Sequence, residues 1–163
     1  MSETNRKAFL DMIGRSEGTS NNLATANDGY DVIVTGVDGK PEVFTDYSDH
    51  PFVDRKPKQI NKSGLYSSAA GKYQILFKFW PYYKRLLKLK DFSPESQDKV
   101  ALQLIKECKA LDDIDAGKIP AAISKCSRIW ASLPGNSYGQ RTHKVSSLMA
   151  FYKEAGGTTS KVA

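Results

Sequence analysis

The chain has 163 residues, of which 40% are hydrophobic and 26% are charged. Such a chain can bury a sizeable core, which excludes a disordered, collagen-like or disulfide-stapled protein. The formal net charge of +6 favours an anionic partner: a nucleic acid, a membrane surface or an acidic polymer. Residues 61–163 hold 17 Lys and Arg against 8 Asp and Glu, whereas residues 1–60 hold 7 against 10. The second part of the chain is therefore expected to supply the positive field.

The cysteines, histidines and apolar runs argue against several further classes of protein. Two cysteines, Cys108 and Cys126, are too few for a disulfide framework, so we expect buried free thiols. Neither His50 nor His143 lies in a zinc-binding pattern, and we expect no metal. No apolar run approaches the ~18 residues of a membrane span, and no signal-peptide pattern precedes the first predicted helix. We therefore expect synthesis in a cytoplasm and no membrane insertion.

The first predicted element is a helix over residues 4–17. Phe9, Ile13 and Glu17 recur at helical spacing, so one stripe begins apolar and ends in a carboxylic acid. Gly18 then ends the helix, because glycine suits the position just past a helix C-terminus. Glu17 is therefore expected on the core-facing side.

A small antiparallel sheet or hairpin is predicted next. Residues 30–34 are β-branched and aromatic, and residues 43–45 follow a turn signal at residues 38–39. Residues 48–68 are rich in Pro, Lys, Asn and Ser, which is typical of a long surface loop. We place this small β lobe at about residues 28–68.

The remainder of the chain is predicted to be helical. Apolar residues recur at helical spacing in the following segments: 71–79, 81–87, 93–108, 121–131 and 140–154. Pro81 and Pro94 support two of these starts, because Pro suits the first helical turn. The predicted fold class is α+β, mainly helical with a small antiparallel sheet, in a single domain whose helical lobe spans about residues 70–155.

Glu17 is the first candidate for catalysis. Burial disfavours the carboxylate and raises its pKa from about 4.3 toward ~6–7, where glutamic acid can donate a proton near neutral pH. A glycosidic oxygen is a poor leaving group until it is protonated, so a glycosidase fits an acid in this position. The alternative is that Glu17 only ends its helix and points to solvent.

An ordinary glycosidase also needs a second carboxylate, about 5–5.5 Å away for retention and about 6.5–9.5 Å away for inversion. The candidates lie in the predicted hairpin region: Asp28, Asp31, Asp38, Glu42, Asp46 and Asp49. Asp31 stands out slightly, because strand alternation separates it from Tyr30 and Val32. Periodicity leaves the choice among these acids open.

A function of another class, a non-catalytic basic module that binds cell wall or nucleic acid, is favoured by the charge alone. Nucleic-acid binding would require a signature such as an RNP, KH or zinc-finger pattern, and none is present in the sequence. We therefore expect no nucleic-acid partner.

Several blocks of sequence, in order, resemble the phage lambda endolysin family: residues 6–12, 16–19, 29–34, 44–51, 70–75, 129–135 and 138–140. The resemblance covers nearly the whole chain. It implies a lysozyme-like fold and an enzyme that cleaves bacterial peptidoglycan as a lytic transglycosylase, without metal or cofactor. The chain departs from the pattern at Arg15, where relatives can carry an aromatic residue, and in longer segments over residues 35–42 and 52–68.

The resemblance places the family's essential acid on Glu17. This residue would protonate the oxygen between N-acetylmuramic acid and N-acetylglucosamine. It would then take the proton of the muramoyl 6-hydroxyl as that group closes a 1,6-anhydro ring. One carboxyl group would then suffice. The alternative is a muramidase that uses water, with Glu17 and a hairpin aspartate such as Asp31.

The resemblance also implies substrate-binding residues. Gln74 matches the glutamine of the G-x-x-Q-I/L pattern, and Tyr138 matches a tyrosine of the cleft. Ser16, Tyr30 and Asp31 are weaker candidates for contact with the sugar.

The partners and location follow from the same resemblance. We expect a monomer that acts on peptidoglycan glycan strands during host cell lysis. Because no export signal is recognised, we expect release from the host cytoplasm to the periplasm through a separate pore-forming holin.

Overall fold

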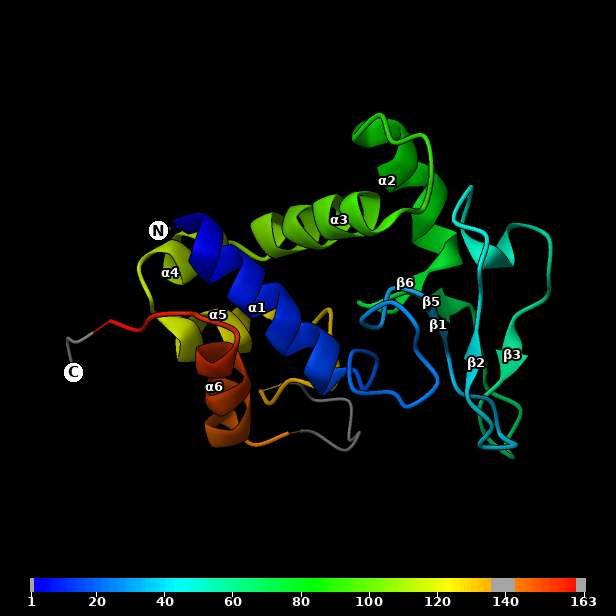
Figure 1. Ribbon diagram of the computed structural model, residues 1–163, viewed down its shortest axis with the longest axis horizontal. Helices are drawn as coiled ribbons and strands as arrows, with labels where there is room; N and C mark the ends of the chain where they lie inside the picture. The colour runs from blue at the N-terminus through cyan, green and yellow to red at the C-terminus, as the bar shows by residue number, and fades with distance from the viewer. Residues whose placement is uncertain (1, 136–142, 161–163) are drawn as a thin grey trace. The chain divides into compact units, whose positions relative to one another are not determined.

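The computed structural model describes residues 2–135 and 143–160 (Figure 1). The chain divides into two compact units, one built from residues 1–17 and 101–163 and the other from residues 18–100. Each unit has its own buried apolar residues. The single domain expected from the sequence, with lobes at about residues 28–68 and 70–155, stays a prediction.

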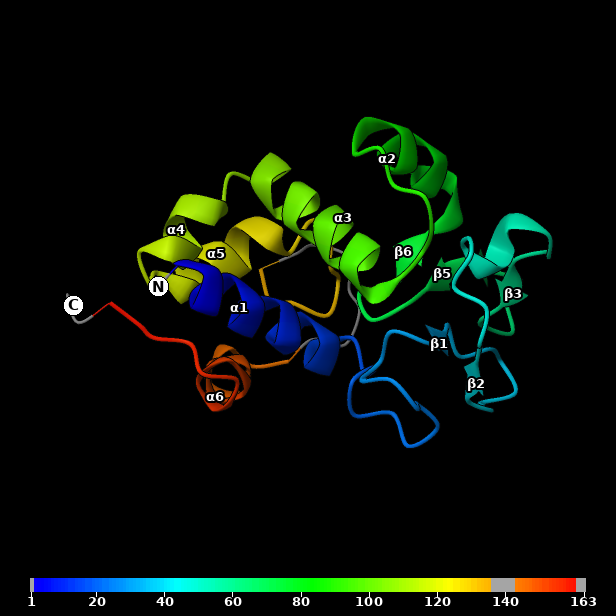
Figure 2. The ribbon, with the colours of Figure 1, turned by 45° about the horizontal axis from the view of Figure 1, so that its top comes forward.

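The first unit is organised around helix α1, Ser2–Ser16. It packs against α4, Leu111–Asp115, and against α6, Val145–Glu154. Helix α5, Ile119–Cys126, contacts both α4 and α6. Figures 1 and 2 both show α6 alongside α1.

The predicted apolar stripe of α1 faces this helical core. Phe9 and Ile13 are fully buried. The other large buried side chains of the unit come from α1, α3, α4, α5, α6 and the segment that follows α5: Met12, Ile105, Ile114, Ile119, Ile123, Trp130, Leu148 and Tyr152. Burying each such side chain contributes about 1.5–3 kcal/mol, so α1 is strongly held in its unit.

The second unit contains an antiparallel sheet in the order β2-β1-β5-β6. The central strand β1, Val32–Ile33, pairs with β2, Glu42–Val43, and with β5, Ala69–Ala70. Strand β5 pairs in turn with β6, Ile75–Leu76. A strand is found within residues 30–34 as predicted, but it is shorter; the strand predicted at residues 43–45 is observed one residue earlier, at Glu42–Val43.

The predicted helix over residues 71–79 is wrong. The chain turns sharply at Gly71, with φ 85°, and at Gln74, with φ 53°, so Ile75–Leu76 folds back to pair with β5. A short 3-10 helix, Phe77–Phe79, then leads into α2, Trp80–Leu86. The apolar residues that suggested helical periodicity are instead shared between a strand and a 3-10 turn.

The predicted loop over residues 48–68 also contains regular structure. It holds a 3-10 helix, Pro51–Val53, and a two-stranded sheet of β3, Lys58–Gln59, with β4, Tyr66–Ser67. These elements are too short to show a periodic sequence pattern.

The remaining helices agree with prediction in part. Helix α3, Pro94–Glu107, starts at the proline that predicted it. The helix predicted over residues 121–131 is observed as Ile119–Cys126, and α4 was not predicted. No helix within residues 2–135 and 143–160 is both long enough and apolar enough to cross a membrane.

Candidate active site

Glu17 directly follows the last residue of α1. Its backbone N–H still donates to the carbonyl of Ile13 at 2.8 Å, and Gly18 then adopts a left-handed conformation with φ 75°. Phe9 and Ile13, earlier on the same stripe, are fully buried, whereas Glu17 is partly exposed. The helix therefore holds this carboxyl group at the boundary between core and solvent.

Two serine hydroxyls connect the Glu17 carboxyl group to the end of α1. The Ser132 hydroxyl donates to Oε2 of Glu17. Ser132 Oγ lies 3.0 Å from Ser16 Oγ, and Ser16 Oγ donates to the carbonyl of Ile13 at 3.0 Å. His143 Nε2 donates to the carbonyl of Ser16 at 3.1 Å. Residues from three separate stretches of the chain thus fix the surroundings of one carboxyl group.

This chain of hydroxyls can serve either protonation state of Glu17. When the carboxyl group is ionised, the single Ser132 proton points to it. When Oε1 carries the proton of the acid, Ser132 keeps its bond to Oε2; when Oε2 carries it, the acid donates to Ser132, whose own proton then turns to Ser16 Oγ. Ser16 keeps its bond to Ile13 in both cases. A change of one proton at Glu17 therefore needs at most the rotation of one hydroxyl.

The electrostatics favour the protonated state more than in a free glutamate. Burial raises the pKa of the Glu17 carboxyl group from 4.5 to about 7, against the opposing effect of the Ser132 hydrogen bond. Both states are therefore populated near neutral pH. A group with this pKa can donate a proton and later accept one.

Arg15, the departure from the family pattern, points to α6. Its guanidinium lies 4.2 Å from the ring centroid of Phe151, and Nη1 lies 3.9 Å from Oε2 of Glu154. The side chain thus packs as a cation on an aromatic face within the helical unit.

Tyr30 lies in a hydrogen-bonded group of the second unit. Its hydroxyl donates to Oδ1 of Asp98 at 2.8 Å, and the Tyr73 hydroxyl donates to the same oxygen at 2.5 Å. The Lys72 ammonium lies 4.8 Å from the centre of the Tyr30 ring. Burial raises the pKa of Tyr30 to about 12, so the phenol stays protonated at neutral pH.

Asp31, the favoured second carboxylate, is buried and engaged by its own loop. One carboxylate oxygen accepts the hydroxyl proton of Thr25, and the other accepts the backbone N–H of Ala26 at 2.9 Å. These bonds close the loop that leads into β1. Such bonds are typical of an aspartate that stabilises a turn.

Gln74 holds the turn between β5 and β6. Its side-chain amide donates to the carbonyl of Gly71 at 2.9 Å, and its backbone is left-handed. Tyr138, the other residue that matches the family pattern, lies outside the described residues.

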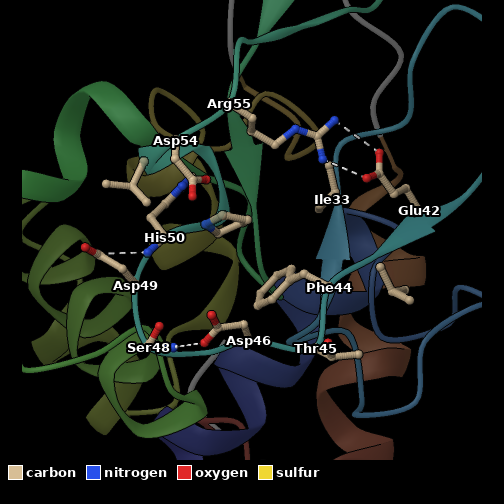
Figure 3. Close-up of a pocket in the computed structure, with 13 residues that line it drawn as sticks. Ile33, Glu42, Phe44, Thr45, Asp46, Ser48, Asp49, His50, Asp54 and Arg55 are labelled. Carbon is tan, nitrogen blue, oxygen red and sulfur yellow. Dashed lines mark hydrogen bonds and ion pairs between the residues drawn. The ribbon is translucent and has the colours of Figure 1, made fainter.

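A hollow of about 420 Å³ lies on the second unit, between β2 and the segment that follows it. Figure 3 shows that Arg55 pairs with Glu42, at 2.7 Å, and that Asp49 bonds the backbone of His50. The carboxylate of Asp46 accepts the backbone N–H of Ser48 at 2.9 Å. Glu17 and the substrate-binding candidates within the described residues do not line this hollow, whereas three of the hairpin acids considered as a second carboxylate do: Glu42, Asp46 and Asp49. In the described part of the chain, no cluster of three His, Cys, Asp or Glu side chains could hold a metal ion.

Sequence reasoning missed Ser132, His143 and Asp98 as parts of these groups. Ser132 is separated from Glu17 by more than a hundred residues, and helical periodicity carries no information over such a distance. The sequence carries only a weak signal for Ser132: it is a small polar residue between Trp130 and Leu133, which are both buried.

Comparison with known proteins gives consistent results. The family model described as Endolysin matches residues 7–159. The endolysin of Escherichia phage P2 is 58% identical over 154 residues, which cover 94% of this chain and 93% of that protein. The endolysin of Escherichia phage lambda is 57% identical over 158 residues, which cover 96% and 94% of the two chains.

Solved structures agree with these sequence matches. The structure of bacteriophage lambda lysozyme complexed with a chitohexasaccharide matches with a TM-score of 0.87 and 57% identity over 96% of each chain. A second structure of lysozyme from bacteriophage lambda matches with a TM-score of 0.83. The predicted α+β, lysozyme-like fold is confirmed. This chain belongs to the endolysin family.

Proposed function

We propose that this protein cleaves the bond between N-acetylmuramic acid and N-acetylglucosamine in peptidoglycan as a lytic transglycosylase. The observation that carries the proposal is the setting of Glu17 in a chain of the endolysin family: a partly buried carboxyl group bonded to the Ser132 hydroxyl, which in turn contacts the Ser16 hydroxyl. This setting favours a group that can act first as an acid and then as a base.

In the first step, protonated Glu17 donates its proton to the glycosidic oxygen. The bond from this oxygen to C1 of the muramoyl sugar breaks, and the N-acetylglucosamine end leaves with a hydroxyl. In the second step, the muramoyl 6-hydroxyl attacks C1 and its proton returns to Glu17. The sugar closes a 1,6-anhydro ring, no water is consumed, and the acid is regenerated. The tethered hydroxyl has the advantage of proximity over water.

Ser132 and Ser16 have a positioning role in these two steps. The proton that Glu17 gives to the sugar and later takes back is carried by Oε1, while the Ser132 hydroxyl keeps donating to Oε2. The carboxyl group is therefore kept in one orientation through both steps. His143 and Ile13 hold Ser16 from the other side.

The arrangement around Asp31 supports a mechanism with one carboxyl group. Both of its oxygens already accept hydrogen bonds from Thr25 and Ala26 within one loop. Asp31 is also 3% exposed, so little of its carboxylate is open to a water or a sugar. We therefore favour attack by the muramoyl hydroxyl over attack by water that a hairpin aspartate activates.

The masses of the products test this mechanism. Purified peptidoglycan is digested with the wild-type protein and with Glu17→Gln, and the muropeptides are measured by mass spectrometry. We expect anhydro ends from the wild type and no cleavage by the folded variant. Products with reducing ends, heavier by one water for each cleavage, would instead establish hydrolysis.

We further propose that glycan strands are the substrate and that the protein acts as a monomer. The solved structure of the similar lambda lysozyme with a chitohexasaccharide supports a glycan as ligand. We also propose that a separate holin releases the protein from the host cytoplasm to the periplasm. Expression in a host cell without a pore-forming protein should leave the cells intact, and coexpression with a holin should lyse them.

A further inference from the structure

Two free cysteines lie where the end of α3 meets the end of α5. Cys108 is the first residue after α3, and Cys126 is the last residue of α5. Both thiols are buried and free of any disulfide, and each is the largest influence on the pKa of the other, so the two sulfurs lie close together. Nothing in the proposed glycan chemistry uses this pair.

The backbone is held together on both sides of the two cysteines. Arg128 Nη2 donates to the carbonyl of Glu107 at 3.0 Å. Lys125 Nζ donates to the carbonyl of Lys109 at 3.4 Å. The residues that flank one cysteine are thus bonded to side chains close to the other, and this holds the two cysteine-bearing segments together.

The two thiols differ in access and in acidity. Cys108 is 7% exposed, whereas Cys126 is fully buried. The hydrogen bond with Cys126 lowers the pKa of the Cys108 thiol, and the Arg128 guanidinium acts in the same direction. A thiolate is the nucleophile in disulfide exchange, so Cys108 is placed to react first.

We propose that Cys108 and Cys126 form an intramolecular disulfide when the protein meets a disulfide oxidant. The inference stands on the paired thiols and their flanking bonds, and it goes beyond the proposed glycan cleavage without depending on it. A protein made in a reducing cytoplasm would carry the two thiols, and an oxidising compartment would close the bridge.

The thiol–disulfide exchange with the oxidant proceeds in two steps. The Cys108 thiol loses its proton to water, and the thiolate attacks one sulfur of the oxidant, whose other sulfur leaves as a thiolate. The Cys126 thiol then loses its proton and attacks the Cys108 sulfur, and the second oxidant thiolate leaves. The two cysteines lose two protons and two electrons, and the oxidant disulfide is reduced to two thiols.

The bridge should stabilise the first unit. It would join the chain between positions 108 and 126, a segment that includes α4 and α5. Closing a loop of about this size restricts the unfolded chain enough to raise Tm by about 5–10 °C in a protein of this length.

The test uses the full chain, purified in reduced form and equilibrated with glutathione disulfide. We expect an intact mass lower by two hydrogens, no uptake of a thiol alkylator under denaturing conditions, and a peptide that links Cys108 to Cys126. Tm should rise, and a reducing agent should reverse all of these changes. Cys108→Ser and Cys126→Ser are matched controls, and neither should show the mass loss or the rise in Tm.

Two outcomes would overturn the inference. The first is a wild-type protein that still takes up two alkyl groups after equilibration, or that ends as glutathione adducts or linked dimers. The second is an internal bridge that leaves Tm unchanged or lower, because the native positions of the two sulfurs would then not accommodate it.

Discussion

Replacing Glu17 by Gln is expected to remove activity and, above neutral pH, to stabilise the folded protein. In the folded protein burial raises the pKa of Glu17 from 4.5 to about 7. Below pH 4.5 Glu17 is protonated in both the folded and the unfolded protein, so it does not reduce the free energy of unfolding. As pH rises to 7 the unfolded chain loses this proton more readily than the folded protein, and the free energy of unfolding falls. A glutamine stays neutral at every pH, so it avoids this loss.

The magnitude follows from the two pKa values. A difference between 4.5 and about 7 corresponds to about 3 kcal/mol in the free energy of unfolding once pH exceeds 7. Glu17 is partly exposed, and solvent screening reduces this to about 2 kcal/mol. At pH 4 the expected difference between variant and wild type is close to zero.

Urea unfolding at a series of pH values between 4 and 8.5 measures this difference. Other titrating groups are present in both proteins, so subtraction isolates Glu17. A difference that grows between pH 4.5 and 7 and then levels off is expected. A difference that stays constant over the whole range would refute a raised pKa at Glu17 and, with it, the assignment of this residue as an acid near neutral pH.

Three further outcomes are expected. Ser132→Ala removes a bond that favours the Glu17 carboxylate, so the alkaline limit of activity on peptidoglycan should move to higher pH; Ser132→Thr, which keeps a hydroxyl, should restore it. The contribution of His50 to wild-type stability should fall by about 2–3 kcal/mol as pH drops from 6.5 to 4, because burial lowers the pKa of His50 to about 4 and the unfolded chain binds the proton first; the stability difference between wild type and His50→Gln, measured by thermal melts across this range, should show the loss. Gly71→Ala should lower the free energy of unfolding by about 2–4 kcal/mol, since φ is 85° and a Cβ would lie 2.3 Å from Oε1 of Gln97. Urea unfolding measures this change, and an unchanged urea midpoint would contradict it.

The sequence predicted α1 and its acidic end because the information is local. Phe9, Ile13 and Glu17 share one face by helical spacing alone, and Gly18 marks the stop. The two buried positions and the change of conformation at Gly18 agree with this prediction. Local spacing could not predict how far the Glu17 side chain is buried, because that depends on residues distant in the sequence that pack around it.

Residues 71–79 show how tertiary pairing overrides a local pattern. Their apolar residues fit a helix as well as they fit a short strand, because a segment of this length samples too few periods to separate the two. The segment forms a strand because β6 pairs with β5 and because the backbone turns back in a left-handed conformation at Gly71 and Gln74. The predicted helix failed for this reason.

The partners of Glu17 could not be predicted from spacing. Ser132 and His143 reach α1 through the packing of the first unit, and neither residue type is unusual in its own segment. The family resemblance brought Ser132 into a matching block without assigning it a role. The hydroxyl chain becomes visible only when the distances between its oxygens are known.

The position of Glu17 at the end of a deeply buried helix links stability to the proposed chemistry. Holding a carboxyl group at a raised pKa costs about 2 kcal/mol above neutral pH. Phe9, Met12 and Ile13 are fully buried, and each contributes about 1.5–3 kcal/mol, which exceeds that cost. An acid at the end of a less buried helix would relax toward solvent and regain an ordinary pKa. The apolar stripe of α1 is therefore part of what keeps Glu17 able to donate a proton.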